Sequence, residues 1–139
     1  MKIAIINGPN LNLLGKREPE IYGSKSFEDF FTELQQRFPG VAFEYFQSNH
    51  EGALIDKMQS LNEIAAGIIL NAAGYSHTSI ALADTIAAIN VPVVEVHISD
   101  IHKREDFRRH SYTALQAKHM ITGHGLEGYA EAVEWFLKH

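Results

Sequence analysis

The fold is decided by residues 67–97, GIILNAAGYSHTSIALADTIAAINVPVVEVH. An apolar run at each end of this stretch is typical of a buried strand, and the segment between them has the small residues of a closely packed helix. A strand, a helix and a second strand in succession predict a parallel pair, because the helix carries the chain back across the sheet. We expect strands over 67–70 and 93–97, and a helix over 76–89 capped by Ser76 or Thr78.

The same alternation continues on both sides of this stretch. Apolar runs predict further strands over 2–6, 41–46 and 119–122, and amphipathic segments predict helices over 27–38, 54–64 and 126–137. A short polar helix is expected over 104–110. The pattern predicts an α/β fold, a flavodoxin-like doubly wound sandwich with a five-stranded parallel sheet, forming a single catalytic domain over residues 1–139.

The composition limits the classes of function. With 139 residues, 45% of them hydrophobic and 21% charged, the chain has the profile of an ordinary soluble globular protein. A formal net charge of -5 argues against a general nucleic-acid binder. The absence of cysteine excludes disulfides and thiol chemistry. No signal-peptide pattern and no apolar run of roughly 20 residues are present, so we expect a cytoplasmic protein with no membrane partner.

A long connection follows the first predicted strand. Residues 7–23, NGPNLNLLGKREPEIYG, exceed the roughly 12–15 residues beyond which a connection is usually functional or disordered. Its apolar side chains favour a loop that folds back onto a surface: Leu11, Leu13, Leu14 and Ile21. All five predicted strands also end in polar residues, and the carboxyl ends of parallel strands share one edge of a sheet. We therefore expect a pocket for a hydroxylated molecule, closed by this loop.

Tyr22 is the candidate base of the loop, and Arg17 is the candidate group that lowers its pKa. Tyrosine has a reference pKa near 10, so a base at neutral pH needs the pKa lowered by about 3 units, or roughly 4 kcal/mol. A close, partly desolvated Arg17 could supply this, because a guanidinium favours the phenolate. The spacing alone favours the alternative, a tyrosine that packs the loop beside a solvated arginine.

His97 and Glu95 form a second candidate pair. Residues i and i+2 of a strand share a face, so Glu95 could orient the His97 imidazole for general acid catalysis. A histidine that merely caps the strand is the alternative. The backbone N–H groups of Ile98 and Ser99 follow directly and could hold a carboxylate.

The third helix and the basic segment supply further candidates. His77 lies at the pocket edge, whereas Asp84, seven residues later, lies about 10 Å further along the helix. Asp84 should therefore be a surface acid or serve a neighbouring subunit. The basic cluster is either a solvated helix face or, through Arg104 and Arg108 at i and i+4, part of an anion or diol pocket. Its members are Lys103, Arg104, Arg108, Arg109 and His110.

Several other interpretations are weaker. Residues 123–128 match the GxGxxG pattern, but no second strand follows, so we expect a tight turn into the last helix. The eight histidines show no metal-ligand spacing, and no metal is expected. A flavin binder or a signalling receiver would need a phosphate loop or acidic residues after the first strand, where residues 7–10 offer neither.

The assembled motifs resemble the type II 3-dehydroquinate dehydratase family. The similar segments occur in the family's order along nearly the whole chain: NGPNLNLLGKREPEIYG (7–23), QSNHEG (47–52), NAAGYSHTS (71–79), EVHIS (95–99) and HKREDFRRHSY (102–112). The resemblance implies anti elimination of water from 3-dehydroquinate, through an enolate, to give 3-dehydroshikimate, with no cofactor. This reaction is a shikimate-pathway step of aromatic amino acid biosynthesis, although a catabolic role would use the same site.

The resemblance also implies residue roles. Tyr22 matches the base, Arg17 the arginine that favours its phenolate, and Asn10 the residue that positions a water at the enolate oxygen. His97 matches the general acid, with Glu95 as its partner. The residues that match substrate-binding groups are Asn71, His77, Asp84, Ile98, Ser99 and Arg108, of which Asp84 reaches the adjacent subunit's site.

The resemblance further implies a homododecamer of four trimers, and an inactive oligomer of the same family is the competing hypothesis. The chain departs from the family's usual residues at Asp100, His119 and His124.

Overall fold

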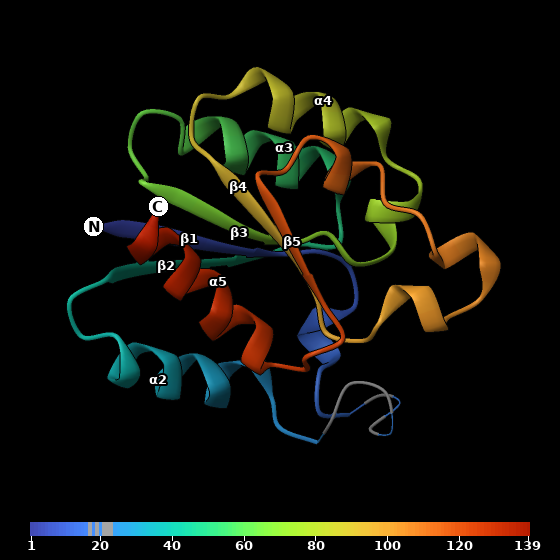
Figure 1. Cartoon of the computed structure of the whole chain (residues 1–139), viewed down its shortest axis with the longest axis horizontal. Coiled ribbons are helices and arrows are strands. Elements are labelled where there is room, and N and C mark those ends of the chain that lie inside the picture. Colours follow the sequence, from blue (N-terminus) through green and yellow to red (C-terminus); the bar gives the residue numbers. More distant parts are fainter. Residues whose placement is uncertain (17, 19, 21–23) are drawn as a thin grey trace.

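The protein forms a single parallel sheet with helices on both faces (Figure 1). The computed structural model describes residues 1–16, 18, 20 and 24–139. Five strands follow the order β2-β1-β3-β4-β5, and every neighbouring pair is parallel. The strands are β1 (Lys2–Asn7), β2 (Ala42–Gln47), β3 (Gly67–Asn71), β4 (Val93–His97) and β5 (His119–Thr122). This architecture confirms the predicted flavodoxin-like sandwich.

Two helices cover each face of the sheet. Helices α2 (Phe27–Arg37) and α5 (Glu127–Lys138) pack on one face, and α3 (Glu51–Ser60) and α4 (Ile80–Ala88) pack on the other (Figure 1). Two separate clusters of buried apolar side chains fill the space between the sheet and these helix pairs. In the part of the chain that the structure describes, no helix combines the length and apolarity needed to cross a membrane.

Helix α2 illustrates how local sequence produces these elements. The Ser26 hydroxyl accepts a hydrogen bond from the Asp29 backbone N–H at 3.1 Å, which caps the first turn. Phe27, Phe30 and Leu34 then recur at helical spacing, and all three are buried against the sheet. The predicted cap and apolar face are therefore both confirmed.

The helix predicted over 76–89 begins later than expected, at Ile80. Ser79, and not Ser76 or Thr78, is the cap, because its hydroxyl accepts from the Leu82 N–H at 2.9 Å. The preceding residues form a 3-10 helix, η2 (Ala73–His77), in which the Ser76 hydroxyl donates to the Ala73 carbonyl at 2.8 Å. That local bond satisfies Ser76 within the turn and leaves Ser79 to start the α-helix.

The helix predicted over 104–110 is also wrong. Within this range the chain forms only one short 3-10 helix, η4 (Asp106–Arg108). Another, η3 (Ile101–Lys103), precedes it, and extended backbone at Arg104 separates the two. The Arg104 guanidinium donates to the Ser99 hydroxyl at 3.0 Å, and the Arg109 guanidinium donates to the Arg104 carbonyl at 3.2 Å. The second contact gives the Arg104 carbonyl a side-chain partner in place of the backbone N–H that a continuous helix would supply.

Tyr129 ties together the carboxyl ends of the two central strands. Its buried hydroxyl donates to the Asn7 Oδ1 atom at 2.8 Å and accepts from the Asn71 Nδ2 atom at 2.9 Å. Gly8 makes the close approach possible, because a Cβ atom there would lie 2.5 Å from the Ala72 carbonyl oxygen. The carboxyl ends of β1 and β3 are therefore held together by the buried network around Tyr129 and by the close backbone approach of Gly8 to Ala72.

A ring stack lies at the opposite, amino-terminal end of β5. The Trp135 indole stacks with the imidazoles of His119 and His139, with centroid distances of 5.9 and 4.3 Å and nearly parallel planes. His124 pairs with Glu131 of α5 at 2.8 Å. Two of the three residues that depart from the family pattern, His119 and His124, therefore contact α5.

We expect the substitution Tyr129→Phe to lower the free energy of unfolding by about 1–3 kcal/mol, because it leaves buried Asn7 and Asn71 groups without their partner. Denaturant unfolding measures the change. Tyr45→Phe is the matched control, since the Tyr45 hydroxyl is only half-buried and its contact with Asn7 is 3.4 Å long. Equal losses in the two variants would contradict this account of the network.

Candidate active site

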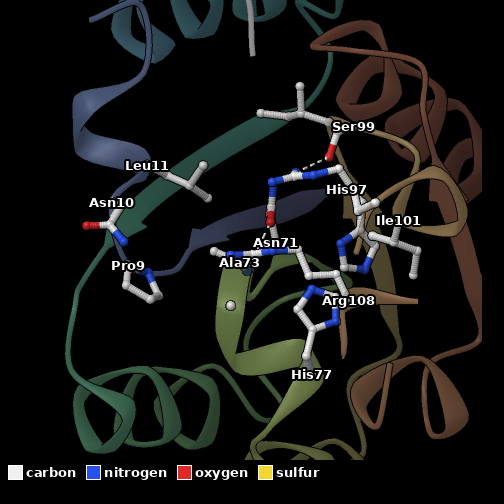
Figure 2. Close-up of a pocket in the computed structure, with 13 residues that line it drawn as sticks. Pro9, Asn10, Leu11, Asn71, Ala73, His77, His97, Ser99, Ile101 and Arg108 are labelled. Carbon is white, nitrogen blue, oxygen red and sulfur yellow. Dashed lines mark hydrogen bonds between the residues drawn. The ribbon is translucent and has the colours of Figure 1, made fainter. Parts of the chain in front are cut away.

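A pocket of about 200 Å³ lies at the carboxyl ends of β1, β3 and β4 (Figure 2). The strand order reverses direction between β1 and β3, and doubly wound folds bind ligands at such a switch point. The lining is mixed, with amide, imidazole, hydroxyl and guanidinium groups beside a few apolar side chains. The lining residues are Pro9, Asn10, Leu11, Asn71, Ala73, Gly74, His77, His97, Ile98, Ser99, Ile101, Arg104 and Arg108.

The ends of the two outer strands buttress the pocket without lining it. At the end of β2, Gln47 donates to the Gly8 carbonyl at 3.1 Å, and just after the strand the Asn49 side chain accepts from the Asn10 N–H at 3.0 Å. At the end of β5, the Thr122 hydroxyl accepts from the Ile101 N–H and donates to the Ser99 carbonyl. The polar ends of β1, β3 and β4 therefore line the pocket, and those of β2 and β5 hold the residues around it in place.

The first part of the long connection packs onto the protein as predicted. Leu11 and Leu14 are buried, whereas Leu13 is exposed and contradicts the expectation for that residue. Asn10 adopts a left-handed conformation, with φ of 71°, at the start of a 3-10 helix over Leu11–Leu13 (η1). This places Asn10 at the pocket rim, beside the end of β1.

Glu95 and His97 face the same side of β4 and contact each other. The His97 Nε2 atom lies 2.6 Å from the Glu95 Oε2 atom, and both side chains are almost wholly buried. His97 lines the pocket, while Glu95 lies behind it. The carboxylate therefore orients the ring and supplies a counter-charge when the ring is protonated.

Two hydroxyl groups complete the surroundings of Glu95. The Ser111 hydroxyl donates to Oε2 at 2.7 Å, and the Thr113 hydroxyl donates to Oε1. Burial raises the pKa of Glu95, but the hydrogen bond and charge of His97 and the bonds from Thr113 and Ser111 outweigh it. The pKa of Glu95 is consequently held below its usual value, and the carboxylate is ionised at neutral pH.

The basic segment brings two guanidinium groups to the pocket. Arg104 and Arg108 both line it although no continuous helix joins them, while Lys103, Arg109 and His110 are exposed. The Arg108 Nε atom pairs with Glu105 at 2.7 Å, which holds the side chain on the pocket side of its 3-10 helix. Guanidinium groups bind carboxylates and hydroxyls through directed N–H donors, so the pocket suits a polyhydroxylated anion.

His77 reaches the pocket from η2, and Figure 2 shows its ring near the Arg108 side chain and the His97 ring. The His77 and His97 ring centroids lie 6.1 Å apart. Burial lowers the pKa of the His77 imidazole, the His110 carbonyl opposes that shift, and His97 and Arg108 add to it. The net direction is downward, so His77 is neutral at neutral pH.

Most of the predicted site residues meet at this pocket. Those that line it are Asn10, Asn71, His77, His97, Ile98, Ser99 and Arg108. Asp84 lies on the exposed surface of α4 and does not line the pocket, as the helix geometry predicts. Arg17, Tyr22 and Ile21 lie outside the described residues.

Sequence reasoning did not identify Ser111 and Thr113 as part of the site. Their spacing of two residues is a weak signal, because nothing local indicates that both hydroxyls reach a strand 16 to 18 residues earlier. Within the ranges that the structure covers, no group of three or more histidine, cysteine or acidic side chains could hold a metal ion.

Known proteins resemble this chain over nearly its whole length. The family model described as "Dehydroquinase class II" matches residues 1–137. The chain belongs to the class II dehydroquinase family. Membership confirms the type II resemblance that the ordered motifs indicate, and with it the prediction of a hydro-lyase.

Two relatives illustrate the similarity of this class II dehydroquinase in sequence. The chain is 53% identical over 135 residues to a 3-dehydroquinate dehydratase of Halothermothrix orenii, covering 96% of this chain and 91% of the relative. It is 44% identical over 153 residues to a catabolic 3-dehydroquinase of Podospora anserina, covering 99% and 94%.

A solved structure agrees with the fold. The type II dehydroquinase of Butyrivibrio crossotus superimposes with a TM-score of 0.95 at 40% identity, covering 99% of this chain and 97% of that one.

We expect Thr113→Val to destabilise the protein by about 1.5–3 kcal/mol at neutral pH, because it removes a hydrogen bond to a buried carboxylate. Since the folded pKa of Glu95 is depressed, this stabilisation is present above the ordinary carboxyl pKa and is lost as pH falls through the folded value. Unfolding measured across that range should show the two proteins converge in acid.

The control is Thr85→Val, which removes a hydroxyl that donates to the neutral Ala81 carbonyl at 2.9 Å. Its cost should be smaller and independent of pH. A pH-independent cost for Thr113→Val would contradict the assigned role of the Glu95 charge.

Proposed function

We propose that this class II dehydroquinase converts 3-dehydroquinate to 3-dehydroshikimate by anti elimination of water through an enolate. The observation that carries the proposal is the Glu95–His97 pair, which opens into a pocket lined by two guanidinium groups in a chain of this family. The relatives' names supply the substrate, and the pocket supports a molecule of that chemistry, a carboxylate with several hydroxyls.

The proposed first step is proton removal alpha to the ketone. Tyr22, as the phenolate favoured by Arg17, is the base, and its phenol carries the proton away. The electron pair moves onto the ketone oxygen as an enolate, stabilised by a water that Asn10 positions. Asn10 lies at the pocket rim in a conformation held by Asn49, which supports this role.

The proposed second step is departure of the hydroxyl. His97 donates a proton to it, the enolate electrons return to form the carbon–carbon double bond, and one water leaves. Glu95 acts as the counter-charge to the imidazolium, which is supported by the 2.6 Å contact and by its depressed pKa. No step requires a metal ion or a redox cofactor to balance.

Substrate binding is assigned to the polar lining. Ser99 and the backbone of Ile98 hold the carboxylate together with Asn71, while His77 and Arg108 hold hydroxyls. All five residues line one continuous pocket, which supports the assignment.

The proposal extends to assembly and role in metabolism. We propose a dodecamer of four trimers, in which Asp84 completes the pocket of an adjacent subunit; Asp84 is exposed on α4, and Ile80, one turn away, is 60% exposed. We also propose a cytoplasmic enzyme of the shikimate pathway. The higher identity to a relative without the catabolic name favours that assignment.

Addition of 3-dehydroquinate should cause ultraviolet absorbance to rise as the conjugated enone product forms. Tyr22→Phe and His97→Ala should each reduce kcat at least a hundredfold, because each removes a proton-transfer group. Folded protein that gives no absorbance change would overturn the proposed reaction, and a Tyr22→Phe variant near the wild-type rate would overturn the assigned base.

Arg108→Ala should raise KM about tenfold or more with a smaller change in kcat, because it removes a charged hydrogen-bond donor from the pocket. Lys103→Ala is the control, since Lys103 is an exposed cation of the same segment and does not line the pocket. Steady-state kinetics of the two variants separate pocket binding from general loss of positive charge. Similar KM changes in both would contradict the assignment.

Light scattering of the purified protein should give a mass near twelve times the 15.6 kDa of one chain. Asp84→Ala should lower activity although Asp84 is outside the pocket of its own chain. A fully active monomer would rule out both the assembly and the role of Asp84.

A further inference from the structure

His77 and His110 are joined by a reciprocal pair of hydrogen bonds. The His77 Nδ1 atom lies 2.7 Å from the backbone carbonyl oxygen of His110, and the His110 Nε2 atom lies 2.7 Å from the carbonyl oxygen of His77. The neighbouring residue Ser76 is also bonded to this segment, because its carbonyl accepts from the Tyr112 N–H at 2.8 Å. The two segments are therefore held at adjacent points. The segment that carries Arg108 is thereby fastened to η2.

These contacts determine where the proton of each ring lies. A carbonyl oxygen can only accept a hydrogen bond, so the His77 Nδ1 atom and the His110 Nε2 atom must both carry hydrogen. A neutral His77 then has no hydrogen on Nε2, which presents a lone pair. Burial lowers the pKa of His77 and keeps the ring in this neutral form.

The unprotonated atom faces the ligand. Figure 2 shows the far edge of the His77 ring, which carries Nε2, directed into the pocket near Arg108. The charged or titratable groups around the ring are His97 from β4, Arg108 from η4 and His110 from the segment that follows it. The pocket therefore presents a group that only accepts, Nε2, beside a guanidinium that only donates.

We propose that His110 is a positioning residue that locks His77 in its Nδ1–H tautomer, and that His77 with Arg108 thereby selects a hydroxyl over a carboxylate at this point of the pocket. A hydroxyl satisfies both groups, because it accepts from Arg108 and donates to the His77 Nε2 atom. A carboxylate accepts only, and it would meet the Nε2 lone pair without a hydrogen between them. The inference rests on the proposed function for the identity of the substrate.

The decisive variants are His110→Asn and His110→Gln. A glutamine side chain carries its amide nitrogen near the position of the histidine Nε2 atom, so it keeps the donor to the His77 carbonyl, whereas asparagine is too short. Both variants lose the ring contact between His110 and Tyr112, at a centroid distance of 4.9 Å, so that loss cancels in the comparison. His110 is exposed, and circular dichroism would verify that both variants fold.

We expect His110→Asn to raise KM for 3-dehydroquinate roughly threefold to tenfold with kcat within about twofold, which is the effect of one weakened hydrogen bond. His110→Gln should restore KM. Because the His110 carbonyl favours the protonated His77 ring, its displacement should also move the acid limb of the KM profile to lower pH. In the His77→Ala background, His110→Asn should have no further effect on KM.

Ring nitrogen chemical shifts of protein labelled with 15N at histidine report the tautomer without any turnover. His77, assigned by the loss of its signals in His77→Ala, should show a protonated Nδ1 and an unprotonated Nε2, and should become a mixture of tautomers in His110→Asn. An Nε2–H tautomer in the wild type, or an equal KM for the Asn and Gln variants, would overturn the lock. Absence of wild-type turnover with the expected tautomer would overturn the proposed substrate alone.

Discussion

The ionised Glu95 carboxylate, buried on the inner strand β4, is the constraint on which the site depends. A buried charge is costly unless its oxygen atoms are paired, and here three side chains satisfy them: His97, Ser111 and Thr113. Ser111 and Thr113 belong to the segment that directly follows the basic residues. Their hydrogen bonds to Glu95 therefore also hold that segment across the carboxyl ends of the strands, where Arg104 and Arg108 line the pocket. The arginine side of the pocket and the imidazole side are therefore assembled by one electrostatic requirement.

The layer architecture follows from hydrophobic periodicity that is visible in the chain. Apolar runs such as 67–70 and 93–97 are buried on both faces, and the helical spacing of Phe27, Phe30 and Leu34 marks the side that meets the sheet. The errors fall where several residues could serve one role. Ser76, Thr78 and Ser79 are all chemically able to cap a helix, and only the turn made by the preceding residues selects Ser79.

The site was predictable to the extent that strand ends define it. The convergence of Asn71, His77 and His97 follows from parallel strands and from the switch in strand order. The partners of Glu95 were not predictable, because Ser111 and Thr113 reach it through a long, irregular connection. The 3-10 turns around Arg104 and Arg108 were missed for a related reason: their conformation is set by contacts with Ser99 and Glu105, which periodicity does not encode.

The stack of His119, Trp135 and His139 has a practical consequence for spectroscopy. Trp135 is the only tryptophan of the chain, and it lies near the start of β5, at the edge of the sheet opposite the pocket. Because this stack joins the start of β5 to the end of α5, the intrinsic fluorescence of this protein should report whether the last helix is attached to the sheet. Occupancy of the pocket at the other edge should leave that emission almost unchanged.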